Sequence, residues 1–311
     1  MKTKIAIVGV GHVGSHVASM LISRQLCDEL VLIDKDTKKA IGHAWDLTDT
    51  TAYQGHACKI KAGDYSDIKD ASILFFCACG GYFNENRLEE LDESMEIVDE
   101  VAPQIEKSGF HGIVISITNP CDLVAYYLQT KLSATVIGSG TILDSGRFRT
   151  YIADALDVDV KSVDAYCFGE HGDSQVPIWS QVRIGGKALL AALQELGKEE
   201  CFSFTDIEEK TIFAGAKIAG AKGCTEFGIG LAASELAGAI LHDEMRVLPC
   251  STLLKGEYGE EGLYASVPCL VGDGGVKQVW SLKLNEEESR RFHNSCSIMK
   301  RYIAEKMSCD R

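Results

Sequence analysis

Residues 4–14 read Lys-Ile-Ala-Ile-Val-Gly-Val-Gly-His-Val-Gly, an apolar run that enters a G-x-G-x-x-G pattern. A short continuous apolar run is typical of a strand buried on both faces of a parallel sheet. In such a pattern Gly9 permits the tight turn, Gly11 lets the backbone approach a pyrophosphate, and Gly14 lets the next helix pack closely on the strand. The stretch therefore predicts the first strand, turn and helix of a doubly wound sheet with a dinucleotide site.

The residues around this turn indicate which dinucleotide is expected. His12 and Val13 open the predicted helix, so their backbone N–H groups can donate to phosphate oxygens. Asp34 ends the next apolar run and can accept hydrogen bonds from the adenosine ribose hydroxyls. Its charge would repel a 2′-phosphate, so NAD is expected in preference to NADP. Three nearby lysines would reduce that repulsion, so NADP is not excluded; they are Lys35, Lys38 and Lys39. The alternative is another Rossmann-like domain, such as one that binds a methyl donor.

The alternation of strand and helix continues along the amino-terminal half. Further apolar runs typical of parallel strands lie at 30–33, 73–76, 113–117 and 135–137. Helix-compatible stretches separate most of them, at 14–25, 36–48 and 91–108. Beyond about residue 140, helix-compatible segments precede strand-like ones, at 205–222, 226–242, 247–252, 264–269, 276–280 and a final helix at 285–306. The predicted fold class is α/β: a Rossmann doubly wound parallel sheet over residues 1–140, then an α+β substrate domain over residues 141–311.

Composition excludes several classes of partner. The chain has 311 residues and a net charge of -14, whereas nucleic acid and anionic membranes both require a basic face. The apolar stretch after Met1 is too short for the core of a signal peptide, and no later run reaches the length of a membrane span. Twelve cysteines form no dense disulfide framework in a chain of this length, which predicts reduced thiols and a cytoplasmic protein. Cys77-x-Cys79 has the wrong spacing for a zinc knuckle, and no metal site is expected.

Asn119 lies in a Thr-Asn-Pro turn directly after the apolar run at 113–117. Residues just beyond the carboxyl end of a central strand lie at the crevice where doubly wound sheets bind ligands. Asn119 is therefore a candidate to bind a substrate carbonyl oxygen or the nicotinamide ribose. The alternative is an ordinary turn residue before proline.

The strongest catalytic candidate is His171, within the run Gly-Glu-His-Gly-Asp at 169–173. Upstream, Asp144 and Arg147 are three residues apart, so both project from one face of a helix. A planar guanidinium can hold a carboxylate through two parallel hydrogen bonds. The alternative is an exposed ion pair of little energetic value.

Taken together, these motifs resemble the L-lactate/malate dehydrogenase superfamily along essentially the whole chain. The matching pieces, in order, are the glycine pattern at 9–14, I-T-N-P at 117–120, G-S-G-T-x-L-D-S-x-R-F-R at 138–149, G-E-H-G-D-S at 169–174 and K-G-x-T at 222–225. Each motif alone is weak, but five in the right order are specific. Within the superfamily, the resemblance is closest to the L-lactate and L-2-hydroxyisocaproate dehydrogenase types.

This resemblance implies a role for each matching residue. His171 would be the acid–base group that protonates the substrate carbonyl oxygen, and Asp144 would orient its imidazole. Arg147 would clamp the substrate carboxylate, and Thr225 would line the substrate pocket. Arg87, in the glycine-bearing loop that begins at Gly80, would polarise the carbonyl and count as both catalytic and substrate-binding. Gly80 would also contact the cofactor.

The same loop is expected to select the substrate. In the relatives, the residue that separates lactate from malate lies six residues before the loop arginine, which here is Gly81, next to Tyr82 and Phe83. No arginine between Gly80 and Asn86 could neutralise a second carboxylate, so malate is disfavoured. Tyr82 would instead meet an apolar side chain, so substrates from pyruvate to branched or aromatic 2-oxo acids are expected.

Two alternatives stay open for the function. One is malate dehydrogenase, within the same chemistry. The other is a non-catalytic NAD-binding regulator that kept the fold. The resemblance also implies a homotetramer or homodimer.

Overall fold

The apolar run at residues 4–8 is the central strand of the large sheet in a computed structural model of the chain, which describes residues 2–80 and 90–307. β1 (Lys4–Val8) pairs in parallel with β2 (Glu29–Ile33) on one side and β4 (Ile73–Phe76) on the other. Further parallel strands complete this part of the sheet: β3 (Lys59–Ala62), β5 (Ile113–Ser116) and β6 (Thr135–Gly138). The order β3-β2-β1-β4-β5-β6 is that of a doubly wound sheet, which confirms the predicted fold class.

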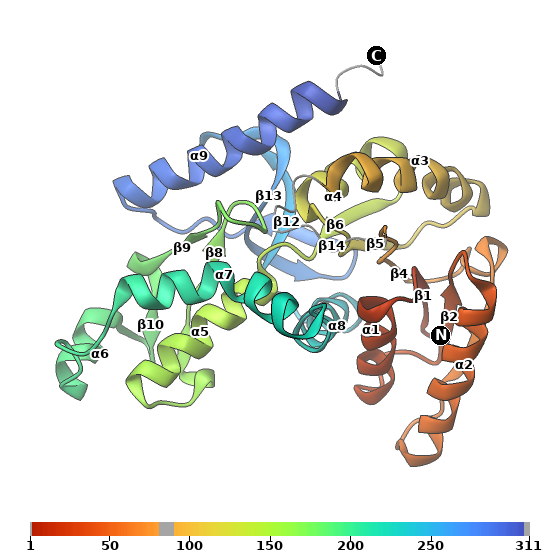
Figure 1. Ribbon diagram of the computed structural model, residues 1–311, viewed down its shortest axis with the longest axis horizontal. Coiled ribbons are helices and arrows are strands. Elements are labelled where there is room, and N and C mark those ends of the chain that lie inside the picture. The colour runs from red at the N-terminus through yellow and green to blue at the C-terminus, as the bar shows by residue number, and fades with distance from the viewer. Residues whose placement is uncertain (1, 81–89, 308–311) are drawn as a thin grey trace.

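Helices of the amino-terminal half, together with α8 of the carboxy-terminal half, cover both faces of the parallel strands (Figure 1). One face carries α1 (His12–Ser23), α2 (Thr37–Thr50) and α8 (Phe227–Leu241); the other carries α3 (Leu91–Ser108) and α4 (Cys121–Lys131). Successive residues of β1 alternate between these layers. Ile5 and Ile7 belong to the same apolar cluster as Leu21 of α1, whereas Ala6 and Val8 belong to the cluster on the α3–α4 face. Every strand of the centre is therefore buried on both sides, which is why its sequence is continuously apolar.

Antiparallel strands from the carboxy-terminal half extend the same sheet. β12 (Arg246–Lys255) pairs with β6 through Ser251 and Gly138, and β13 (Glu261–Gly272) and β14 (Gly275–Val279) follow it. The described residues thus form one nine-stranded sheet across both halves of the chain. This continuation protects the edge of β6, which would otherwise expose unpaired backbone groups.

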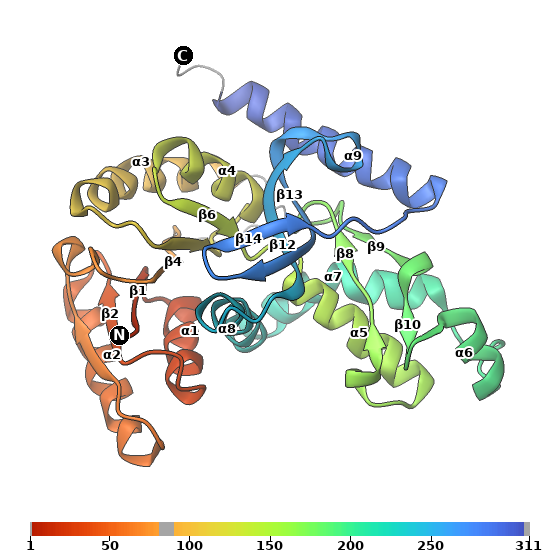
Figure 2. The same ribbon diagram turned by 180° about the vertical axis from the view of Figure 1, so that it is seen from behind.

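The remaining elements of the carboxy-terminal half form a smaller α+β layer beside the sheet (Figure 2). Its helices are α5 (Ile142–Leu156), α6 (Leu189–Leu196), α7 (Phe204–Lys222) and α9 (Glu286–Tyr302). Its short strands are β7 (Val163–Asp164), β8 (Cys167–Phe168), β9 (Val176–Pro177), β10 (Arg183–Ile184) and β11 (Lys187–Ala188). Phe148, Ile152 and Leu193 are among the buried side chains of its own apolar cluster. Among the described residues, no helix combines the length and the apolar character needed to cross a membrane.

Two elements of the first half do not follow from the apolar runs. β3 reads Lys-Ile-Lys-Ala and is only half-buried, because it lies at the sheet edge. α4 is buried around most of its circumference, and so it lacks the polar stripe of a surface helix. In the second half, the final α-helix ends earlier than expected, at Tyr302. A short π-helix over Ile303–Met307 follows it.

Candidate active site

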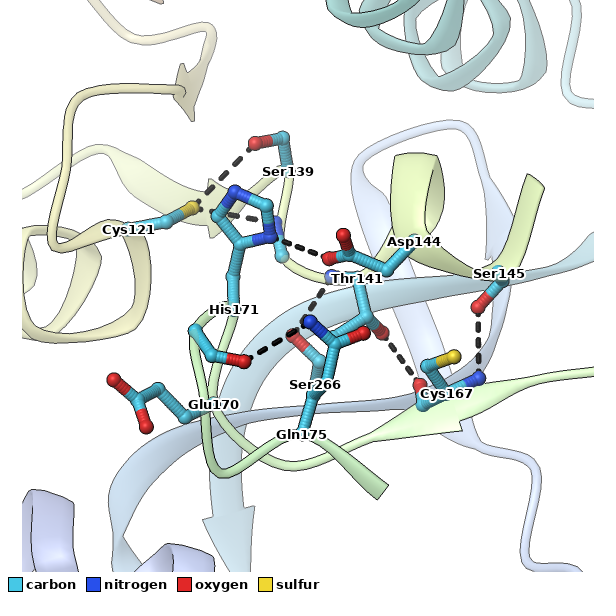
Figure 3. Close-up of polar contacts among 12 residues, drawn as sticks. Cys121, Ser139, Thr141, Asp144, Ser145, Cys167, Glu170, His171, Gln175 and Ser266 are labelled. Carbon is cyan, nitrogen blue, oxygen red and sulfur yellow. Dashed lines mark hydrogen bonds and ion pairs between the residues drawn. The ribbon is translucent and has the colours of Figure 1, made fainter. Parts of the chain in front are cut away.

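His171 and Asp144 come together from different elements of the carboxy-terminal half (Figure 3). His171 lies in the loop between β8 and β9, and Asp144 lies in the first turn of α5. His171 Nδ1 is 2.5 Å from Asp144 Oδ2, and the two side chains are 11% and 1% exposed. Because an ionised carboxylate only accepts, Nδ1 carries the proton of this hydrogen bond. The opposite ring nitrogen, Nε2, points away from Asp144.

Asp144 also binds Arg147 from the same helix. Arg147 Nη1 donates to Asp144 Oδ1 over 2.9 Å, so one carboxylate links the imidazole to the guanidinium. From the sequence alone, Asp144 and Arg147 could have formed an exposed ion pair. The pair is instead largely buried, because the Arg147 side chain is 11% exposed and that of Asp144 is 1% exposed. Burial strengthens the interaction, because the surrounding dielectric is lower than that of water. This contact occupies one of the five N–H donors of the guanidinium.

The backbone of the His171 loop is held by Asp122, a residue that sequence reasoning did not single out. The His171 N–H donates to Asp122 Oδ2 over 2.7 Å, and the Ser266 hydroxyl donates to Asp122 Oδ1 over 3.1 Å. Burial raises the pKa of the Asp122 carboxyl, although these hydrogen bonds favour its ionised form. No local pattern marks Asp122 as a partner of His171, because 49 positions of sequence separate them.

Glycine is required at the start of the loop. Gly169 has a φ of +88°, and a Cβ there would come within 2.5 Å of Ser295 Oγ. Its backbone forms a reciprocal bridge with Ser266, and the next residue, Glu170, donates its N–H to Ser295 Oγ over 2.9 Å. The loop is therefore anchored to β13 on one side and to α9 on the other, which positions the imidazole.

The predicted cofactor turn has two packing glycines and one open glycine. A Cβ on Gly9 would lie 2.5 Å from the Ala78 nitrogen, and one on Gly14 would lie 2.0 Å from the Gly9 oxygen. A Cβ on Gly11 would meet only Lys39 Nζ, at 3.8 Å. The open side of Gly11, at the start of α1, therefore fits the close approach of a pyrophosphate, as the sequence pattern predicts.

Asp34 is fixed beside this turn. Its Oδ2 accepts from the Val10 N–H over 2.7 Å, and its Oδ1 accepts from the Asp36 N–H over 3.0 Å. Lys39 Nζ lies 3.8 Å from Asp34 Oδ2, so of the three lysines considered it is the one placed next to the carboxylate. An acidic group held at this point fits a ribose diol.

Asn119 lies in the connection between β5 and α4, where its backbone oxygen accepts from Ser94 Oγ over 2.6 Å. Within the described part of the chain, its buried Oδ1 has no hydrogen-bond partner. A buried acceptor of this kind calls for a donor from a ligand or from water. The amide is thus suited to a hydroxyl-bearing ligand.

The other predicted site residues are only partly placed. Gly80 belongs to the segment that follows β4, and Thr225 is half-buried in the turn between α7 and α8. Gly81, Tyr82, Phe83 and Arg87 lie outside the described residues.

Comparisons with known proteins cover both halves of the chain. A family model described as "lactate/malate dehydrogenase, NAD binding domain" matches residues 3–137. A second, described as "lactate/malate dehydrogenase, alpha/beta C-terminal domain", matches residues 141–309. An L-lactate dehydrogenase of Fusobacterium nucleatum is 38% identical over 305 residues, which is 96% of each chain. L-lactate dehydrogenase 3 of Bacillus cereus is 39% identical over 308 residues, again 96% of each chain.

Solved structures show the same similarity. The minor L-lactate dehydrogenase of Enterococcus mundtii superposes with a TM-score of 0.93 at 34% identity, over 98% of both chains. The malate dehydrogenase of Cryptosporidium parvum superposes with a TM-score of 0.92 at 31% identity, over 99% of this chain and 100% of that one.

Proposed function

Because the chain belongs to the lactate/malate dehydrogenase family, we propose that it is an L-2-hydroxy-acid dehydrogenase of the lactate type. It transfers hydride between NAD(H) and a small 2-hydroxy acid, with pyruvate or a larger apolar 2-oxo acid such as 2-oxoisocaproate as the oxidised substrate. The observation that carries this proposal is the buried carboxylate of Asp144, bound to both His171 and Arg147.

His171 serves as the acid–base group in this proposal. Its Nε2 donates a proton to the substrate carbonyl oxygen in the reductive direction and takes it back in the oxidative one. Asp144 keeps the proton on Nδ1 and stabilises the imidazolium, the form of His171 that donates a proton from Nε2. NADH held by the amino-terminal half would supply the hydride.

Arg147 orients the substrate. One of its N–H groups is held by Asp144, which keeps the guanidinium plane close to the imidazole. The remaining donors suit a bidentate hold on a carboxylate. Because the acid is held next to His171, the entropic cost of orienting the two reacting groups is met by binding before the chemical step.

The cofactor is held by the amino-terminal half. Backbone N–H groups at Gly11, His12 and Val13 would hold the pyrophosphate, and Asp34 would accept from the adenosine ribose. Asn119 Oδ1, which is buried without a partner among the described residues, would accept from a hydroxyl of the nicotinamide ribose. Residues 1–140 form the NAD-binding domain and residues 141–311 the substrate domain, a division supported by the two family models.

Substrate choice rests on the loop that contains Tyr82 and Arg87. A lactate-type substrate is supported by the curated relatives, which are L-lactate dehydrogenases of 38% and 39% identity, against 31% for the malate enzyme of known structure. The loop also has no second arginine that could pair with the extra carboxylate of oxaloacetate. Malate is therefore the less favoured substrate.

The quaternary structure is proposed to be a homotetramer or homodimer. Trp45 is 72% exposed near the middle of α2, and Tyr53 is 91% exposed in the turn that follows. Large exposed apolar side chains of this kind suit an interface between subunits. The cytoplasm is proposed as the location, because twelve cysteines in a chain of this length form no dense disulfide framework and suit a reducing compartment.

A panel of substrates tests the function. The oxidation of NADH is followed by absorbance with pyruvate, 2-oxoisocaproate, phenylpyruvate and oxaloacetate, each at matched concentrations. The expected result is turnover with at least one of the first three and a much lower kcat/KM with oxaloacetate. The highest value with oxaloacetate would identify a malate dehydrogenase. No turnover with any of the four, together with measurable NADH binding, would identify a binding protein without catalysis.

A further inference from the structure

Three side chains with metal-ligating atoms meet beside the cofactor turn. His12 is the first residue of α1, and Cys224 and Glu226 lie in the turn between α7 and α8. One ligand atom from each of the three lies within 4.8 Å of those of the other two. This His12–Cys224–Glu226 cluster joins two distant segments, since His12 and Glu226 are 214 positions apart in the sequence.

The two contacts of Glu226 Oε2 within the cluster are close to the spacings of a tetrahedral centre. Glu226 Oε2 is 3.3 Å from His12 Nδ1 and 3.7 Å from Cys224 Sγ. Zinc bonds of about 2.0 Å to nitrogen and oxygen and about 2.3 Å to sulfur place an N···O pair about 3.3 Å apart and an S···O pair about 3.5 Å apart. The two contacts of Glu226 Oε2 are therefore close to the spacings of a tetrahedral site, and His12 Nδ1 and Cys224 Sγ lie within 4.8 Å of each other.

The surroundings hold the Glu226 carboxylate in place. Lys222 pairs with Oε1 of the carboxylate, while Oε2 contacts His12 and Cys224. The Lys222 ammonium also lies over the Phe227 ring, 4.4 Å from its centroid. Both contacts restrict the turn that carries Cys224 and Glu226.

His16 lies next to the cluster, but its Nδ1 atom is already used in another hydrogen bond and is not a ligand. Its Nδ1 lies 3.5 Å from Glu226 Oε2, but it donates to the His12 carbonyl oxygen over 2.9 Å. The Phe227 ring packs edge-on against the His16 ring, with 4.7 Å between the centroids. The protein thus supplies three ligands, and water completes a tetrahedral set.

We propose that His12 Nδ1, Cys224 Sγ and Glu226 Oε2 form a binding site for a divalent transition-metal cation of the Zn²⁺ class. A nitrogen, sulfur and oxygen set favours such a cation over Mg²⁺ or Ca²⁺, which prefer oxygen ligands alone. Neither the proposed dehydrogenase activity nor the family match requires this site, and it departs from the expectation that the chain binds no metal.

Coordination at Cys224 has a proton signature. A free cysteine thiol is protonated at neutral pH, because its ordinary pKa is about 8.5. Since only the thiolate binds zinc, occupancy releases a proton to the buffer.

Isothermal titration of the untagged full chain with ZnCl₂ tests the proposal. We expect one tight site, with an apparent enthalpy that changes between buffers of different ionisation enthalpy because a proton is released. Cys224→Ser and Glu226→Gln should each weaken binding by at least about 10-fold. Cys201→Ser, which removes an exposed cysteine outside the cluster, should leave binding unchanged. Thermal unfolding of every variant verifies that the fold is intact.

A second measurement identifies the ligand directly. Co²⁺ in place of Zn²⁺ should produce a near-ultraviolet band from sulfur-to-cobalt charge transfer, and this band should be absent in Cys224→Ser. The proposal is overturned if the wild type binds no zinc, if Cys224→Ser binds it equally well, or if Cys201→Ser removes the band. None of these readouts depends on turnover, so they are independent of the test of the proposed function.

Discussion

His171 Nδ1 lies 2.5 Å from Asp144 Oδ2, although 27 positions of sequence separate the two residues. The other oxygen of the same carboxylate accepts from Arg147. Asp144 is almost wholly buried, so its charge is balanced by these two partners rather than by water. The proposed acid–base group and the proposed carboxylate clamp therefore depend on one side chain.

Asp144→Asn tests this dependence. The amide keeps the shape of the side chain but cannot balance an imidazolium, so kcat for reduction of the oxo acid should fall by about 10²–10⁴-fold. NADH fluorescence measures cofactor binding, which should stay unchanged. Asp154→Asn, at an exposed position of the same helix, is the matched control. A kcat within about threefold of wild type would remove Asp144 from the proposed mechanism.

Arg147→Lys tests the clamp. Lysine retains the charge but offers a single ammonium in place of a planar pair of donors, so the KM for the oxo acid should rise by about 10–100-fold. Arg149→Lys, exposed on the same helix, should leave the KM unaltered. If both variants keep the wild-type KM, the substrate carboxylate is held elsewhere.

Alanine at two glycines of the cofactor turn should affect two different properties, the stability of the fold and the binding of NADH. A Cβ at Gly14 would lie 2.0 Å from the Gly9 oxygen, so Gly14→Ala should lower the free energy of unfolding by more than about 2 kcal/mol. At Gly11 the Cβ has room, so Gly11→Ala should fold normally but bind NADH at least about 10-fold more weakly. Thermal unfolding and NADH titration of both variants separate the effects. Normal NADH affinity in Gly11→Ala would place the pyrophosphate away from this turn.

Asp122 should make stability depend on pH. Burial raises the pKa of its carboxyl above the ordinary value of about 3.9, so between these two values the folded state binds a proton that the unfolded state releases. Ionisation of Asp122 therefore costs stability as the pH rises through this window, and protonation restores it as the pH falls. Urea unfolding measures the difference between wild type and Asp122→Asn, which should shift in favour of wild type as the pH is lowered toward the ordinary carboxyl pKa of about 3.9. A difference that does not change with pH, or that changes in the opposite direction, contradicts the assignment.

Much of the parallel sheet could be predicted because each strand is identified by its own residues. The runs at 5–8 and 73–76 are apolar throughout, and a strand buried on both faces needs nothing more than that. The junction of β6 with β12 could not be predicted in this way. It joins Gly138 to Ser251, and strand pairing over such a separation depends on which edge remains open once the helices have packed.

Residues that are neighbours along the chain suffice to predict the glycine turn, the acidic residue after the second strand and the residue types of the proposed catalytic set. These features depend on neighbours along the chain, where helix and strand geometry set the spacing. The tertiary structure, in contrast, brings Asp144 to both His171 and Arg147, Asp122 to the His171 loop, and His12 to Cys224 and Glu226. The burial and distances that give these groups their chemistry arise from packing between distant segments, and the local pattern of the chain does not specify that packing.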